Sequence, residues 1–163
     1  MTERRVFRSD TFVNRSFVAG IPFILMFGGL THFAFAWLGK TNWAAPFVPV
    51  NESVWEHLKM SYWTTFLWFF FIFLFFGKRY RLSSSHWLLA GIVSMLFCLL
   101  FIFGIISGQL LASRTYRYVE PHRIRIGMAV ALWLILALAF VLFSFQPPVL
   151  PLFLDTPTGS YGF

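Results

Sequence analysis

A polar stretch, residues 50–59, interrupts an otherwise apolar sequence and carries the side chains best suited to chemistry. It contains two carboxylates, Glu52 and Glu56, and an imidazole, His57. Ionisable groups at the start of a membrane span are costly unless they are solvated, paired or used. Carboxylates and imidazoles in one site are common groups of general acid–base catalysis. We therefore take Glu52, Glu56 and His57 as candidate catalytic residues.

A second histidine, His32, lies in the apolar segment that precedes this stretch. Gly28 and Ala36 share its face of a helix, and such small residues let a neighbouring helix approach closely. His32 is thus expected to point into the protein, where it binds a metal ion, carries a proton or forms a hydrogen bond with a neighbouring group. Because imidazoles and carboxylates ligate zinc and similar divalent ions, His32, Glu56 and His57 are candidate metal ligands. A remaining carboxylate would act as general base on a bound water, although the spacing matches no known zinc signature.

Part of the polar stretch is explained by the start of a helix. If Asn51 is the N-cap, both glutamates fall in the first turns, where the helix dipole favours them. If Ser53 is the N-cap, Ser53 and Glu56 form a capping box that occupies Glu56. Lys59, three residues beyond Glu56, is placed to neutralise it. Neither alternative accounts for His57 and the second carboxylate, which remain for function.

The elements that must position these groups are membrane spans. Hydrophobic residues make up 58% of the chain and charged residues 12%, which is a membrane-protein composition. A span needs roughly 20 apolar residues. Four segments are suitable, at about 17–39, 54–77, 86–112 and 126–145. We predict an all-α fold, one integral membrane domain over residues 1–163 with four transmembrane helices and a proline-rich, non-helical tail at 146–163.

Basic residues form clusters beside the predicted spans. One cluster precedes the first span and another follows the second: Arg4, Arg5, Arg8 and Arg15, then Lys78, Arg79 and Arg81. The positive-inside rule places the N-terminus and this second loop in the cytoplasm, and the 50–59 stretch outside. Despite a pI of about 10.2, such clusters fit anionic lipid headgroups as partners better than nucleic acid.

The third loop conflicts with this orientation, because it is rich in arginine while the tail has no Lys or Arg. Four full spans would put Arg117 and Arg123 outside, where they join Asn51 and Lys59 as candidate ligand-binding residues for an anionic headgroup. Alternatively, residues 86–112 form a re-entrant segment that leaves on the side where it entered, which satisfies the charge rule better. Each arm would reach only about 20 Å, short of the roughly 30 Å hydrocarbon core, so we expect four full spans.

Three motifs occur together in this chain: the stretch from Val50 to Lys59, the upstream Thr31-His32-Phe33 with Trp37-Leu38-Gly39, and the closing Pro-Leu-Phe-Leu-Asp with Thr-Gly-Ser-Tyr-Gly. In these motifs the chain resembles a family of small bacterial multi-pass membrane proteins with no assigned function, although its middle is shorter than expected. The resemblance implies a place in the bacterial cytoplasmic membrane and transfers no activity. If relatives have five spans, the tail lies beside the motif, and Asp155 and Tyr161 join the site.

Two functions fit these features. The first is a metal-binding or acid–base site at the outer membrane boundary, which binds or acts on a lipid or other anionic membrane ligand. The second is a structural or accessory subunit of a larger membrane protein complex, which docks through the aromatic segment 66–76 and ligates haem or a chlorin through His32. The sequence contains no catalytic signature that separates an enzyme from a binding protein.

Overall fold

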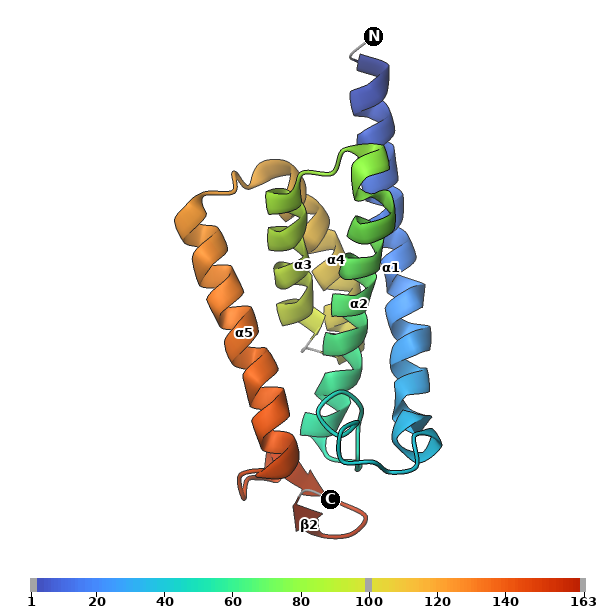
Figure 1. The fold of residues 1–163 in the computed structure, drawn as a ribbon, viewed down its shortest axis with the longest axis vertical. Coiled ribbons are helices and arrows are strands. Elements are labelled where there is room, and N and C mark those ends of the chain that lie inside the picture. The colour runs from blue at the N-terminus through green and yellow to red at the C-terminus, as the bar shows by residue number, and fades with distance from the viewer. Residues whose placement is uncertain (1–2, 99–100, 162–163) are drawn as a thin grey trace.

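The computed structural model describes the backbone of residues 3–98 and 101–161, and the side chains of residues 11–98 and 106–161. It is a bundle of helices with a short tail (Figure 1). The helices are α1 (Glu3–Trp37), α2 (Val54–Tyr80), α3 (Ser84–Cys98), α4 (Phe101–Tyr118) and α5 (Arg123–Phe145). The tail holds a 3-10 turn, η1 (Pro151–Phe153), and an antiparallel pair of two-residue strands, β1 (Leu154–Asp155) and β2 (Ser160–Tyr161).

Three helices in the described part of the chain are long and apolar enough to cross a membrane. They are α1 from Thr11 to Trp37, α2 and α5. The predicted all-helical class is confirmed. The length and composition of these three helices suggest a membrane protein. A fourth span is not confirmed.

The segment predicted as the fourth span, residues 86–112, is not one helix. It is divided between α3 and α4, which run antiparallel as a hairpin (Figure 1). The two arms meet closely, since a Cβ on Gly108 would lie 3.1 Å from the Ser94 carbonyl oxygen, and the Gln109 amide donates to Ser94 Oγ at 2.9 Å. The prediction of a single helix was wrong because a hairpin of apolar arms and a continuous span have the same composition.

This hairpin changes which parts of the chain share an end of the bundle. α1, α3 and α5 begin at one end, and α2 and α4 finish there (Figure 1). This end, the basic end, carries every Lys and Arg of the sequence except Lys40 and Lys59. The opposite end, the motif end, holds residues 38–53 and also the C-terminal tail (Figure 1). Four full spans would have put the tail on the side away from the motif, so that expectation is corrected.

The motif end is built from a turn and a helix cap. After α1, the chain reverses at Gly39 and Lys40, which have φ values of 70° and 55°, a left-handed conformation that glycine adopts without strain. α2 then begins with Ser53 as its N-cap, whose side chain accepts the Glu56 N–H at 3.3 Å. Asn51 accepts the Ser53 N–H at 3.0 Å, so the two alternative cap residues act in sequence.

α5 is the helix least enclosed by the bundle. Its buried side chains, Phe140 and Ser144, both lie in its last two turns. Phe140 packs against Trp55 and Tyr62 of α2, with ring centroids 4.7 and 4.8 Å apart. α5 is thus anchored to α2 near the motif end, and this brings the tail to the start of α2.

Candidate metal centre

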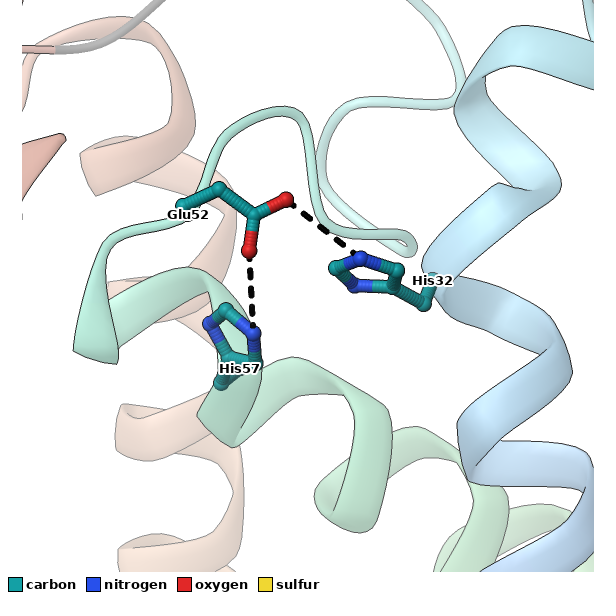
Figure 2. A group of neighbouring side chains, drawn as sticks. All are labelled: His32, Glu52 and His57. Atoms are coloured by element: carbon teal, nitrogen blue, oxygen red, sulfur yellow. Dashed lines mark ion pairs between the residues drawn. The ribbon is translucent and has the colours of Figure 1, made fainter. Parts of the chain in front are cut away.

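Three side chains from three separate segments meet at the motif end: His32 from α1, Glu52 from the loop before α2, and His57 from α2 (Figure 2). Glu52 lies between the two imidazoles. Its Oε1 is 3.3 Å from His32 Nε2, and its Oε2 is 3.5 Å from His57 Nε2. One ligand atom from each residue lies within 4.8 Å of the other two. The predicted convergence of His32 and His57 is therefore found, with Glu52 as the carboxylate between them.

The close approach of α1 and α2 brings the two histidines together. Gly28, one turn before His32, faces α2, and a Cβ there would be 3.5 Å from the Met60 carbonyl oxygen. The imidazole centroids of His32 and His57 are 5.5 Å apart. The predicted small-residue face therefore does contact a neighbouring helix at Gly28, whereas Gly29 beside it faces open space.

The second ring nitrogen of His57 determines how its ring can be used. Nδ1 lies 2.9 Å from the carbonyl oxygen of Ser53. A carbonyl oxygen only accepts hydrogen bonds, so Nδ1 carries the proton. In a neutral ring, Nε2 then presents a lone pair toward a Glu52 oxygen that presents lone pairs of its own. That arrangement is favourable when Nε2 also carries a proton or when a cation lies between the two groups.

Glu56, predicted both as a metal ligand and as a catalytic residue, does not join this group. It is 3% exposed and pairs with Lys59, which is 0% exposed. Lys59 Nζ lies 2.7 and 2.6 Å from the two oxygens of Glu56. The Val50 N–H also donates to Glu56, at 3.0 Å. Because Glu56 points inward to these donors, Glu52 takes the place at the histidines that was assigned to Glu56.

Lys59, predicted as a ligand-binding residue, is likewise buried, and its ammonium group contacts groups inside the protein. Its ammonium group also donates to the Ala45 carbonyl oxygen at 2.9 Å and to Ser144 Oγ at 2.7 Å. These contacts tie α2 to the preceding loop and to α5. Ser144 was not identified as important from the sequence, although a hydroxyl in the apolar run of residues 140–145 was an available signal.

The C-terminal tail contacts the group directly. Asp155 is 4% exposed, and its Oδ1 accepts the backbone N–H of Glu52 at 2.9 Å. The tail thus lies beside the motif, as the five-span alternative implied, although the α3–α4 hairpin is what puts it there. Tyr161 pairs with Leu154 in the strand ladder.

The structure places the remaining predicted ligand-binding residues away from the histidines. Arg117 lies at the basic end, where it donates to Asn14 and, at 3.1 Å, to Ser113. Arg123 begins α5 at the same end. Neither arginine can share a ligand with Glu52, because the hairpin returns the third loop to the side of the N-terminus. Asn51 stays at the motif end, where its side chain accepts the Ser53 N–H just before α2.

Comparison with known proteins identifies the family but no activity. No curated protein and no solved structure matches the chain. The sequence model of a family of unknown function (DUF6512) matches residues 6–105 and 97–163, which together span nearly the whole chain. The chain therefore belongs to this family of unknown function.

Proposed function

We propose that this protein is a membrane metalloprotein in which His32, Glu52 and His57 hold a divalent ion such as zinc at the membrane boundary. The ion binds, or acts on, a lipid headgroup or other anionic membrane ligand. The observation that carries the proposal is the convergence of three ligand atoms within 4.8 Å, with His57 Nδ1 already bonded to a backbone carbonyl. Histidines that bind metal commonly hold their second nitrogen in this way.

Small movements of the side chains would give a tetrahedral ion with one position open. Ligand atoms about 2 Å from an ion are about 3.3 Å from one another around a tetrahedron. The two nitrogen–oxygen distances of the group, 3.3 and 3.5 Å, are close to that value, but they involve different oxygens of Glu52. The three ligand atoms lie within 4.8 Å of one another, so the two imidazoles would draw together around a bound ion. Three protein ligands with a free fourth position are the arrangement of catalytic zinc, which lowers the pKa of a bound water or polarises a bound oxygen.

The side chains of the motif end carry too little positive charge to attract an anion without a bound cation. Glu56 and Lys59 neutralise each other in the interior. The remaining charged side chains are two carboxylates, Glu52 and Asp155, and one amine, Lys40. With Arg117 and Arg123 at the other end, an anionic ligand meets a negative site unless a divalent cation is bound. Metal binding and anion binding are therefore expected to be coupled.

An apolar surface lies beside the histidines. Phe33 contacts the His32 ring edge-on, with centroids 5.3 Å apart, and Trp37 stacks on Phe33 at 6.0 Å. Trp37 is 69% exposed, as expected of tryptophan at the membrane–water interface. A ligand with a charged head and an apolar tail would match this combination of an ion and an exposed aromatic surface.

The test is metal binding by the full-length protein in detergent, measured by competition with a chromophoric zinc chelator after metal removal. We expect one zinc per chain, and an affinity at least about 100-fold lower in His57→Ala and Glu52→Gln, since even outer-shell partners are worth about 10–100-fold. Glu120→Gln, which changes an exposed glutamate at the basic end, is the matched control. A wild-type protein without stoichiometric zinc would contradict the proposal.

Metal-free acid–base chemistry is the second candidate, and one observation favours it. The two oxygens of Glu52 each lie near a histidine Nε2, so a single carboxylate can accept hydrogen bonds from two protonated imidazoles. Absence of zinc from the wild-type protein, together with downfield imidazolium proton signals that Glu52→Gln abolishes, would support this alternative.

The proposal also places the basic end in the bacterial cytoplasm and the metal centre on the outer side. Its support is the gathering of the basic residues at one end, as the positive-inside rule requires. The α3–α4 hairpin then enters and leaves the membrane from the cytoplasmic side. In a Cys98→Ser background, an impermeant maleimide should label Thr156→Cys in intact cells, and Ser84→Cys only after the membrane is opened. The reverse pattern would refute this orientation.

A further inference from the structure

Glu52 differs from the two histidines in the backbone that carries it. His32 and His57 lie on helices, whereas Glu52 precedes the α2 N-cap in a loop. Its side chain is 50% exposed, so packing restrains it weakly. A loop carboxylate ligates well only if its backbone is held, because misplacement of a ligand by about 1 Å is enough to weaken a site.

Hydrogen bonds to side chains hold this loop. Val50 donates its N–H to Glu56, Ser53 donates to Asn51, and Glu52 itself donates to Asp155 at 2.9 Å. The bond to Asp155 is the one made by the ligand residue's own backbone, and it crosses 103 residues of sequence. Asp155 is therefore the contact through which the C-terminal tail holds the backbone of Glu52.

Asp155 is itself held firmly by the tail. Its second oxygen accepts the hydroxyl of Thr158, and its carbonyl oxygen accepts the Gly159 N–H at 2.7 Å. Gly159 has φ of 70°, which closes the turn between β1 and β2. These bonds orient the Asp155 carboxylate so that one oxygen accepts a hydrogen bond within the turn and the other accepts the Glu52 N–H.

The tail is also packed onto the protein beside this bond. Phe153 is 4% exposed and lies between Trp55 of α2 and Phe143 of α5, with ring centroids 4.9 and 5.4 Å away. Trp55 is in the first turn of α2, close to Glu52 in sequence. The tail thus has an apolar anchor in Phe153 and a polar contact in Asp155, two residues apart.

From this arrangement we infer that Asp155 is a positioning residue of the site: it orients Glu52 through the backbone and does not bind the ion. This inference rests on the proposed metal function. It makes the C-terminal tail part of the site, with the sequence from Pro151 to Tyr161 as a clamp on the ligand loop.

Substitutions at Asp155 separate a geometric role from a charge effect. In Asp155→Asn the side-chain oxygen still accepts the Glu52 N–H, but the negative charge is lost. In Asp155→Ala both are lost. Positioning predicts zinc affinity within about threefold of wild type for Asp155→Asn, and a loss of about 10–100-fold for Asp155→Ala, the range of outer-shell contacts. Similar losses in both variants would mean that Asp155 acts by charge, and would overturn the inference.

Two measurements keep the test decisive. Amide hydrogen exchange of Glu52, measured without metal, should be slow in the wild type and in Asp155→Asn and fast in Asp155→Ala. Thr158→Ala, which leaves Asp155 in place but removes its second partner, should lose less affinity than Asp155→Ala. Val149→Ala, which changes an exposed tail residue outside the clamp, is the control for disturbance of the tail. If the wild type binds zinc and Asp155→Ala binds it equally well, the inference fails while the metal site stands. If the wild type binds none, the metal function fails, and unchanged exchange of Glu52 in Asp155→Ala would overturn the positioning role as well.

Discussion

Two clusters of ionisable groups lie within one helical turn of each other at the motif end, and they differ in burial and in saturation. The inner cluster, Glu56 with Lys59, is almost fully buried, and its ammonium and carboxylate groups contact each other and backbone or hydroxyl partners. The outer cluster, His32 with Glu52 and His57, is half-exposed and presents two imidazole nitrogens to one carboxylate. Buried charges that are fully paired belong to the fold, because removal of one partner leaves the other uncompensated, whereas accessible groups with unused lone pairs are available for a ligand.

Removal of Lys59 should have the largest effect and should act on folding. Lys59→Met leaves the Glu56 carboxylate buried without its counter-ion, for which we expect a loss of roughly 3–5 kcal/mol in the free energy of unfolding. The measurement is the thermal or denaturant midpoint in detergent, followed by fluorescence size exclusion. Replacement of both partners in Glu56→Leu/Lys59→Leu should recover most of the loss. If Lys59→Met were as stable as the wild type, the inner cluster would not contribute to the stability of the fold.

Loss of Glu52 should affect zinc binding and leave the metal-free fold intact. Without zinc, we expect Glu52→Gln to lie within about 0.5 kcal/mol of wild-type stability, as for other accessible positions. Zinc at about 100 times its Kd should stabilise the wild type by about 2.7 kcal/mol through mass action and should not stabilise Glu52→Gln. Thermal unfolding with and without zinc measures both effects. If zinc stabilised both proteins equally, Glu52 would not be a zinc ligand, and the outer cluster would not differ from the inner one in ligand binding.

Ser144→Ala tests whether the inner cluster reaches α5. Ser144 Oγ accepts a hydrogen bond from Lys59 at 2.7 Å, and hydrogen bonds to charged groups contribute about 1.5–3 kcal/mol. We expect a loss toward the lower end of that range, because Lys59 keeps its other acceptors. Unfolding should be easier, while zinc affinity measured with the same chelator stays unchanged. A large loss of zinc affinity would indicate that the two clusters act as one site.

Acidification should also separate the clusters, with a smaller effect. Zinc ligation requires deprotonated imidazole, so protons compete with the ion for both histidines. Zinc affinity should therefore fall as the pH is lowered from 8 to 5. Chelator competition across this range is the measurement, with Glu120→Gln following the wild-type profile. A flat profile would exclude histidine ligands.

Some features of the site could be read from local sequence. The cap at Ser53, the helix after it and the charge pair of Glu56 with Lys59 depend on residues three positions apart or fewer. The inward orientation of His32 followed from the small residue Gly28 one turn before it. Such features are predictable because, in a helix, the sequence spacing of two residues determines whether their side chains lie on the same face.

Other features were decided by contacts between distant segments. Glu52 and Glu56 are one turn apart and chemically alike, so the sequence does not show which of them is buried. Ala45 and Ser144 hold Lys59 in the interior, and Glu56 is the glutamate that pairs with it there. The break between α3 and α4 matches the re-entrant alternative, which was set aside in favour of a full span because hydropathy does not distinguish two packed arms from one span. That break put Arg117 at the far end of the molecule and placed the tail at the motif.

The amino-acid sequence by itself determined that this is an apolar helical protein, where α2 begins to within two residues, and which residue types are available at the motif end. These properties depend on composition, capping and helical period, all of which act over a few residues. The tertiary structure alone decided that Glu52 lies between His32 and His57 and that Asp155 holds it there. The reason is physical: a carboxylate becomes a ligand or a structural ion-pair partner according to the groups around it, and those groups come from five separate parts of the chain.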